Sequence, residues 1–191
     1  MSKKVLYCLA NGSEIIEFSI PVDILRRTNS EVFIVKIPDK SDKPNNLICT
    51  LTNGVKVIAD LMIENAINIQ FDMIVCPGGF SGCQTFSECK LLIEMLKKQK
   101  QAKKWYCAIC AAPYLVFGAN HLIDDEFATC YPSFQDKLPK NDKINEKVVV
   151  SNNCITSQGP GTAMEFGYIM AEALHGTKTV QNLKKLMVYQ P

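Results

Sequence analysis

Apolar residues alternate along the chain between short continuous runs and helically spaced positions. The runs have the length of strands buried in a sheet, and they cover residues 3–10, 31–37, 72–76, 105–109, 127–130, 147–150 and 154–157. Helical patterns occupy 14–27, 85–100, 111–117, 162–175 and 179–188, and a shorter helix is expected within 60–70. Strands that alternate with helices predict an α/β fold with a mainly parallel sheet and helices on both faces.

Turn and capping residues predict where several of these elements begin. Asn53-Gly54, between the runs 47–51 and 55–58, predicts a hairpin. Capping boxes at Thr85–Glu88 and Thr162–Glu165 predict the N-termini of two helices. Pro21 interrupts the first helix. Because proline has no N–H, the carbonyl of Glu17, four residues earlier, loses its helical hydrogen bond and the helix should bend there.

Composition and charge narrow the class of protein. The chain has 191 residues, 47% of them hydrophobic, which predicts one domain over residues 1–191. A net charge of +2 gives no electrostatic case for binding nucleic acid. No signal peptide and no apolar run of membrane-spanning length is visible. Nine cysteines, several inside apolar strand-like runs, predict free thiols in a cytoplasmic protein.

The stretch Trp105–Pro113 is the strongest candidate for chemistry. It opens as a buried strand and closes as a helix start, with Cys110 at the junction. A thiol there meets free backbone N–H groups and the positive end of a helix dipole. Both favour the thiolate, so we expect Cys110 to be a reactive nucleophile.

Glu17 and a glycine pair are the next candidates. Glu17 has apolar neighbours on both sides. If it faces an apolar cleft, desolvation raises its pKa, and the protonated acid can donate a hydrogen bond to a thiolate. The alternative is a carboxylate that points to solvent. The backbone at Gly78 and Gly79, with the N–H of Ala111, is suited to an oxyanion hole, or it is a plain strand-to-loop turn.

Other chemistries have weaker support. Cys107 and Cys110 form a C-x-x-C, but Cys107 lies inside an apolar strand, which disfavours thioredoxin-type chemistry. The two histidines, His121 and His175, have no ligand-like neighbours, and no Walker A or dinucleotide fingerprint is present. We therefore predict neither a metal nor a cofactor. The loop Gly159–Thr162 is either an anion site at a helix start or, as we favour, a tight turn and cap.

Several motifs occur together in an order that resembles a known superfamily. They are Leu9–Glu17, Ile20–Asp23, Pro77–Gly79, Ala108–Pro113 and Gly159–Thr162. Over nearly the whole chain, this pattern resembles the DJ-one/ThiJ/PfpI superfamily, and most closely its DJ-one branch. The resemblance implies a flavodoxin-like three-layer sandwich and a homodimer. It also implies an easily oxidised nucleophile matching Cys110, a protonated partner matching Glu17, and an oxyanion site that involves Gly79 and Ala111.

The sequence departs from that branch at two positions. Tyr131 stands where a histidine near the cysteine is expected. With an ordinary pKa of about 10, tyrosine is a poor general base near neutral pH, but it can donate a hydrogen bond. Ala112 stands where the branch has glycine. Ala111 follows the nucleophile, whereas the protease-like branch has a histidine there, which argues against peptidase activity.

The resemblance implies cofactor-independent conversion of methylglyoxal or glyoxal to hydroxy acids, with deglycation of glycated proteins as a related activity. Cys110 and Glu17 would be catalytic, and Gly78, Gly79, Ala111 and Tyr131 would bind the substrate or its oxyanion. The partners are then small reactive aldehydes, with no nucleic acid and no membrane. The rival hypothesis is an oxidative-stress sensor in which Cys110 becomes a sulfinate. A redox-regulated chaperone ranks last, since no exposed apolar stripe is evident.

Overall fold

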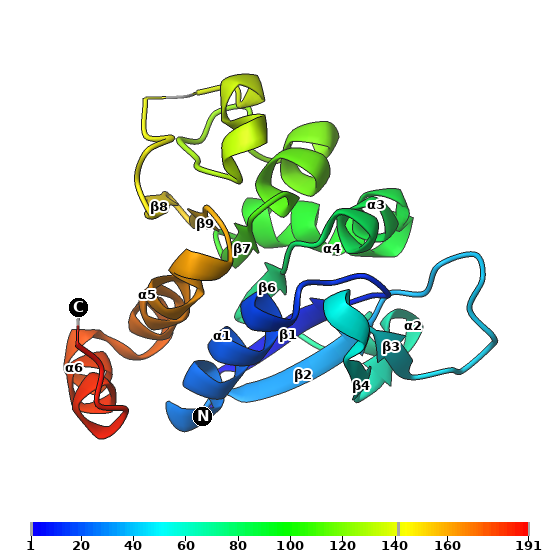
Figure 1. Cartoon of the computed structure of the whole chain (residues 1–191), viewed down its shortest axis with the longest axis horizontal. Coiled ribbons are helices and arrows are strands. Elements are labelled where there is room, and N and C mark those ends of the chain that lie inside the picture. The colour runs from blue at the N-terminus through cyan, green and yellow to red at the C-terminus, as the bar shows by residue number, and fades with distance from the viewer. Residues whose placement is uncertain (1, 141, 191) are drawn as a thin grey trace.

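A seven-stranded sheet forms the centre of the molecule (Figure 1). The computed structural model describes residues 2–140 and 142–190. The strand order is β5-β2-β1-β6-β7-β9-β8, and every pair is parallel except β8 with β9. The predicted mainly parallel sheet is therefore confirmed. The strands are β1 (Lys4–Leu9), β2 (Glu31–Lys36), β5 (Leu61–Met62), β6 (Met73–Cys76), β7 (Trp105–Ile109), β8 (Val148–Ser151) and β9 (Cys154–Ser157).

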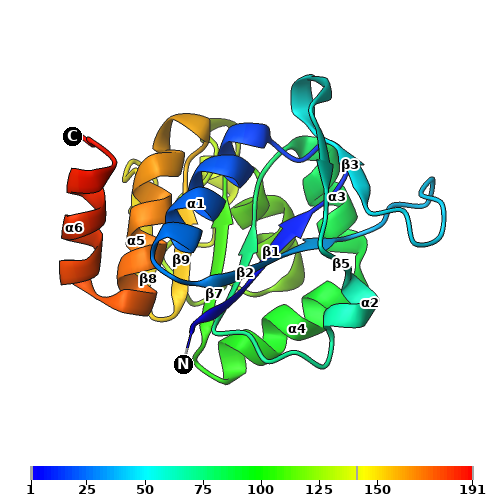
Figure 2. The same cartoon turned by 90° about the horizontal axis from the view of Figure 1, so that it is seen from below.

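Helices cover both faces of this sheet, as the alternating pattern predicts. One apolar cluster joins the sheet to α1 (Ile15–Arg27), α5 (Ala163–His175) and α6 (Thr177–Leu186). These three helices lie side by side in Figure 2. The other cluster joins the opposite face to α2 (Ile63–Ala66), α3 (Phe80–Glu88) and α4 (Lys90–Gln101). The result is the three-layer sandwich of the flavodoxin-like class.

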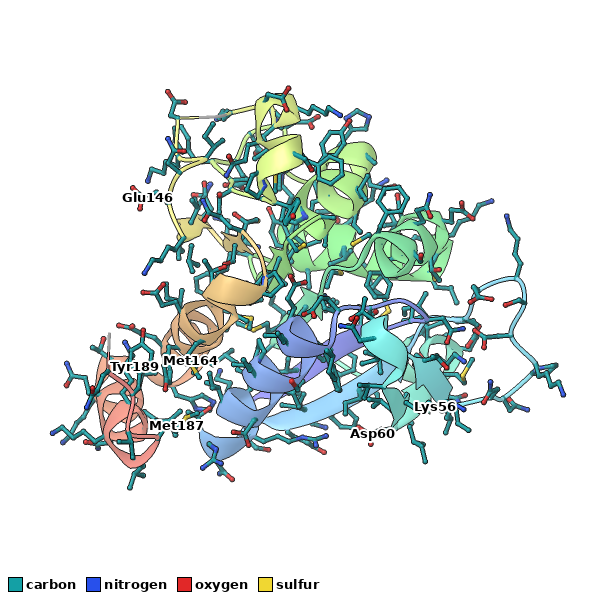
Figure 3. All side chains as sticks on the ribbon, in the orientation of Figure 1. Lys56, Asp60, Glu146, Met164, Met187 and Tyr189 are labelled. Atoms are coloured by element: carbon teal, nitrogen blue, oxygen red, sulfur yellow. The ribbon has the colours of Figure 1, made fainter. Side chains whose placement is uncertain are left out.

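Two smaller features complete the architecture. The predicted hairpin is present as β3 (Ile48–Thr50) and β4 (Lys56–Ile58), joined through a 3₁₀ turn at Thr52–Gly54. After α6 the chain folds back, so that Met187 and Tyr189 lie on the side of α6 that faces α5 (Figure 3). Among the described residues, no helix combines the length and the apolar character needed to cross a membrane.

Neither predicted capping box forms its side-chain bonds, although the helix start predicted at Thr162 is confirmed. Thr85–Glu88 forms the end of α3, because that helix already starts after Gly79, whose φ of +88° turns the chain directly out of β6. The next helix, α4, has Cys89 at its N-cap. Thr162 does precede α5, but its side chain makes no cap bond. Its hydroxyl instead bonds the backbone of Gly159 and the hydroxyl of Ser157.

Three other segments also differ from expectation. Residues 127–130 are coil, exposed at Phe127 and buried from residue 128 to 130, because the N–H of Thr129 bonds the Thr156 hydroxyl and not a strand partner. The segment 60–70 contains the short strand β5 before α2. Over 111–117, where a regular helix was expected, the chain forms a π-helix at Pro113–Phe117. Additional 3₁₀ turns follow at Gly118–Asn120 and Pro132–Lys137.

A buried ion pair secures the long loop after β2. The Lys36 side chain is fully buried, and its Nζ lies 2.6 Å from Asp42 Oδ1 and 2.8 Å from the carbonyl oxygen of Ile48. Asp42 in turn accepts a hydrogen bond from the N–H of Asp39. The carboxylate of Asp39 accepts a second hydrogen bond from the side-chain amide of Asn11, in the loop after β1. The pair therefore joins the loop after β2 to the loop that leads into α1.

We expect Asp42→Ala to lower the free energy of unfolding by about 3 kcal/mol, because a buried ammonium group would lose its counter-charge. Urea unfolding measures this difference. Asp23→Ala is the matched control: Asp23 also lies 2.6 Å from its cation, Arg27, but both side chains are half exposed, so the cost should stay below about 1 kcal/mol. Equal costs for the two variants would contradict the role of burial.

Candidate active site

Cys110 lies at a strained elbow directly after β7. Its φ is +67°, a left-handed conformation that residues other than glycine rarely adopt. Two backbone bonds hold it there: the Cys110 N–H donates to the carbonyl of Ser157 at 3.0 Å, and the Tyr131 N–H donates to the Cys110 carbonyl at 2.7 Å. Strain maintained by the surrounding backbone is typical of nucleophile elbows.

Glu17 enters the site from the neighbouring helix α1. The residue is 0% exposed, so the solvent-facing alternative does not apply. Its Oε2 accepts a hydrogen bond from the N–H of Gly78 at 2.8 Å. Its Oε1 is buried with no hydrogen-bond partner among the described residues. A buried carboxylate oxygen that lacks a partner is costly, and such an atom is a natural place for a proton or a substrate group.

Gly78 is where the two reactive side chains meet. A Cβ atom on this glycine would lie 2.5 Å from Cys110 Cβ, 2.5 Å from Glu17 Oε2 and 3.0 Å from Cys110 Sγ. Any larger residue would force the thiol and the carboxylate apart. The loop after β6 therefore has to carry glycine here, and its N–H orients the acid toward the sulfur.

Gly79 and Ala111 present backbone N–H groups to the Cys110 sulfur. Both groups act to lower the pKa of the Cys110 thiol, as expected for donors that face a developing negative charge. Gly79 has a φ of +88°, and a Cβ atom on it would lie 2.1 Å from the carbonyl oxygen of Gly12. Two donors that converge on one sulfur also flank the position where an attacked carbonyl oxygen would lie.

The ionisation of the two acids is coupled. Burial raises the pKa of Glu17 from 4.5 to about 7, although the contact with Cys110 and the N–H of Gly78 oppose the rise. Burial also raises the pKa of Cys110, and the negative charge and hydrogen bond of Glu17 raise it further. These effects outweigh the N–H groups of Gly79 and Ala111, so the expectation of an acidic thiol from a helix dipole is wrong. The helical segment after Cys110 is too short for a strong dipole.

Two acids in contact cannot both ionise easily, because the charge on one disfavours the charge on the other. Near neutral pH the Cys110 thiol therefore keeps its proton, and Glu17, with a pKa of about 7, is close to half protonated. The arrangement suits a thiol that loses its proton to the neighbouring carboxylate as it attacks a substrate.

Tyr131 and Gly159 border the open side of the site. Tyr131 is 45% exposed, and its ring lies 3.6 Å from the position of a Cβ atom on Gly159. That position is also 3.9 Å from Glu17 Oε1. The sequence pattern favours a tight turn and cap at Gly159, with an anion site as the alternative, and does not indicate its contact with Tyr131. Its place after β9, beside the strand that carries Cys110, was the available signal.

The remaining candidates lie elsewhere. Cys107 is fully buried and packs in the cluster that contains α1 and α5, where it has the surroundings of a core thiol. His121 contacts Asp124, and His175 contacts Ser30. Ala112 is buried beside the elbow. Within residues 2–140 and 142–190, no three His, Cys, Asp or Glu side chains gather in a group that could hold a metal ion.

Comparison with known proteins shows which family the chain matches. The model of the DJ-1/PfpI family matches residues 3–173. The chain is 38% identical over 182 residues to protein DJ-1 homolog A of Arabidopsis thaliana, a match that covers 95% of this chain and 45% of that protein. The chain thus spans less than half the length of this relative.

Two further matches cover more of the compared protein. Over 134 residues the chain is 35% identical to a Caenorhabditis elegans protein named glutathione-independent glyoxalase DJR-1.2, covering 69% of this chain and 70% of that one. The structure of Toxoplasma gondii DJ-1, described as oxidised, matches with a TM-score of 0.92 and 33% identity over the full length of both chains.

Proposed function

This chain belongs to the DJ-1/PfpI family, and we propose that it converts methylglyoxal and glyoxal to hydroxy acids without a cofactor. One observation carries the proposal: the thiol of Cys110 and the buried carboxyl of Glu17 meet at Gly78, which leaves room for no side chain of its own. A nucleophile and a proton carrier in contact are what this reaction needs. The Caenorhabditis elegans relative named as a glyoxalase supports the choice of substrate.

The first step is addition of sulfur to the aldehyde. Cys110 Sγ bonds to the aldehyde carbon while its proton passes to Glu17, and the carbonyl oxygen becomes an oxyanion. The N–H groups of Gly79 and Ala111 stabilise that oxygen. Glu17 then passes the thiol proton to that oxygen, so the product is a hemithioacetal and Glu17 is again a carboxylate that can accept a proton.

The second step moves a proton between the two carbons of the substrate. Glu17 Oε1, the atom without a partner, takes the proton from the former aldehyde carbon to give an enediol and returns a proton to the neighbouring carbon. The first carbon is oxidised to a thioester and the second is reduced to an alcohol, so no external oxidant is required. Water then cleaves the thioester, which frees Cys110 and releases lactate from methylglyoxal or glycolate from glyoxal.

The direct test is an assay of the purified protein with methylglyoxal in buffer that contains a chelator and no glutathione. We expect loss of the aldehyde and formation of an equal amount of lactate. Cys107→Ser should retain the activity, because Cys107 lies in the core and not at the site. Aldehyde loss without lactate would mean simple adduct formation and would refute the proposal.

Tyr131 is proposed to donate a hydrogen bond to the substrate oxygen from the rim of the site. We expect Tyr131→Phe to lower kcat/KM about tenfold, the value of one hydrogen bond of about 1.4 kcal/mol. Tyr114→Phe is the control, since that ring stacks on Phe134 (centroids 5.3 Å apart) and has no assigned part in the reaction. An unchanged kcat/KM for Tyr131→Phe would remove the hydroxyl from the mechanism.

A second candidate function is oxidation sensing by Cys110. Seven of the nine cysteines are buried, while Cys110 and Cys89 are partly exposed. Both of these thiols face two backbone N–H donors, but of the two only Cys110 also faces Glu17. The Toxoplasma gondii relative is described as oxidised. Intact-mass analysis after mild peroxide should show two oxygens added at Cys110 and none at Cys89. Equal modification of both thiols would count against a built sensor.

We also propose that the chain forms a homodimer, as the resemblance implies. Ile16 on α1 and Val55 and Ile58 around β4 are exposed apolar residues that a partner could cover. Light scattering of the purified protein gives the mass that decides this.

A further inference from the structure

Pro21 leaves one carbonyl group of α1 without its helical hydrogen-bond donor, and a residue of another element supplies the donor. Proline lacks an N–H, so the carbonyl of Glu17, four residues earlier, receives no helical hydrogen bond. The hydroxyl of Tyr7, on the adjacent strand β1, donates to that carbonyl oxygen at 2.5 Å, and both groups are buried. Burial raises the pKa of Tyr7 well above 10, so the hydroxyl remains a donor throughout the physiological range.

The side chain of Tyr7 is held in one position by its packing in the sheet and against α1. It is 0% exposed in the middle of β1, between β2 and β6. Its ring meets that of Phe18, the residue after Glu17, edge-to-face with centroids 5.9 Å apart and planes at 79°. The sheet therefore fixes the hydroxyl, and the hydroxyl fixes the turn of α1 that carries Glu17.

The backbone of Glu17 is held on both sides of its Cα atom. Its N–H donates to Glu14 Oε2 at 2.8 Å, and its carbonyl accepts from Tyr7. With Oε2 held by Gly78, the one atom left without a partner is Oε1, the atom assigned to proton transfer. Small displacements of such a group are costly in catalysis.

We propose that Tyr7 is a positioning residue for Glu17: its hydroxyl replaces the helical N–H that Pro21 cannot supply and thereby sets the place of the Glu17 carboxyl beside Cys110. Tyr7 acts through the backbone of Glu17 and touches no substrate. The consequence for turnover rests on the proposed aldehyde reaction, whereas the consequence for Cys110 reactivity does not.

The groups that face Glu17 determine the expected sign of a pH effect. They are Glu14 at the start of α1, Cys110 after β7, Cys83 on α3 and Tyr7 itself, with Tyr131 bordering the open side. The charge and hydrogen bond of Glu17 raise the pKa of Cys110. If Glu17 moves away, that pKa falls and the thiol reacts at lower pH.

The test is Tyr7→Phe, which keeps the ring against Phe18 and removes only the hydroxyl. We expect kcat with methylglyoxal to fall about tenfold with KM changed less than about twofold. The midpoint of the pH profile for iodoacetamide alkylation of Cys110, followed by mass spectrometry, should move down by about half a pH unit.

Tyr106→Phe is the matched control. Tyr106 is equally buried on β7, and its hydroxyl also donates to a backbone carbonyl, that of Leu122 at 3.2 Å, on the other face of the sheet. Losing this bond should cost stability but leave kcat and the Cys110 profile unchanged. If Tyr106→Phe changes them as much as Tyr7→Phe does, the effect of Tyr7 is only structural and the proposal fails.

Rescue gives the sharpest result. In Tyr7→Phe combined with Pro21→Ala, residue 21 regains an N–H that can donate to the Glu17 carbonyl, so kcat and the alkylation profile should return toward wild type. A folded double variant that stays impaired overturns the proposal, and so does an unaffected Tyr7→Phe. If Tyr7→Phe alone does not fold, the double variant decides. If the wild type shows no aldehyde turnover, the proposed function fails and the alkylation profile still decides the role of Tyr7.

Discussion

Cys110→Ser is expected to lower kcat/KM for methylglyoxal by at least about 10³-fold, because every proposed step passes through a bond to this sulfur. Serine is close in size and should tolerate the elbow. Its hydroxyl has a much higher pKa than a thiol, and the Glu17 carboxylate, with a pKa of about 7, is too weak a base to remove that proton. The variant would therefore bind aldehyde without adding to it.

The comparison uses the protein's other thiols as internal controls. Cys107→Ser and Cys89→Ser should keep at least half of the wild-type rate, because neither side chain contacts Glu17 or Gly78. Circular dichroism and unfolding curves are the control that tests whether Cys110→Ser is folded. Full activity in a folded Cys110→Ser variant would show that another group starts the reaction.

The elements that build this site were largely predictable because their signals are local in sequence. Buried runs such as 105–109 have few alternatives to a central parallel strand. Pro77-Gly78-Gly79 stops one such strand, and Cys110 stops the next. Since the carboxyl ends of parallel strands lie at one edge of a sheet, the order of the loops is enough to bring them together.

What the sequence did not reveal depends on contacts between distant residues. Pro21 shows that the Glu17 carbonyl needs a donor, but nothing near it in the chain shows that Tyr7 is the donor. The run 127–130 looks like a strand, yet the hydroxyls of Ser151 and Thr156 accept hydrogen bonds from the N–H groups of Phe127 and Thr129 in place of a ladder. The local sequence pattern shows which backbone groups need a hydrogen-bond partner, and the tertiary structure determines which residue supplies it.

The pKa of Cys110 illustrates the same limit in electrostatics. The N–H groups near a helix start were visible in the sequence and act in the expected direction. Burial and the nearby Glu17 act in the opposite direction and are stronger. Only the three-dimensional proximity of the two acids reveals that they titrate as a coupled pair, and activation of the thiol therefore depends on Glu17.

Glu17→Gln is therefore the second variant with a large expected effect. The amide oxygen can still accept the N–H of Gly78, so the side chain should keep its place. It can neither take the thiol proton nor move one between substrate carbons. We expect kcat to fall about 10³-fold, the middle of the range for loss of a general acid–base. Glu94→Gln, on the exposed face of α4, should leave kcat unchanged.

The same variant should be more stable than the wild type at alkaline pH. The pKa of Glu17 is 4.5 in an ordinary setting and about 7 in the folded protein, so folding favours its protonated form. Below about pH 4.5 the acid is neutral in both states and costs nothing. Between pH 4.5 and 7 the unfolded chain releases this proton while the folded protein keeps it, so the stability of the wild type falls over this range and levels off above about pH 7. The total loss is up to about 3 kcal/mol for a difference of about 2.5 pKa units.

Glutamine does not titrate, so Glu17→Gln escapes this loss. Urea unfolding at pH 5 should give similar stabilities for the two proteins, and at pH 8.5 the variant should be more stable by up to about 3 kcal/mol. Glu94→Gln should show no such divergence between the two pH values. If the gap between wild type and Glu17→Gln does not widen with pH, then Glu17 is not a raised-pKa acid. Lost activity together with gained stability would instead identify Glu17 as a residue kept for chemistry at the expense of the fold.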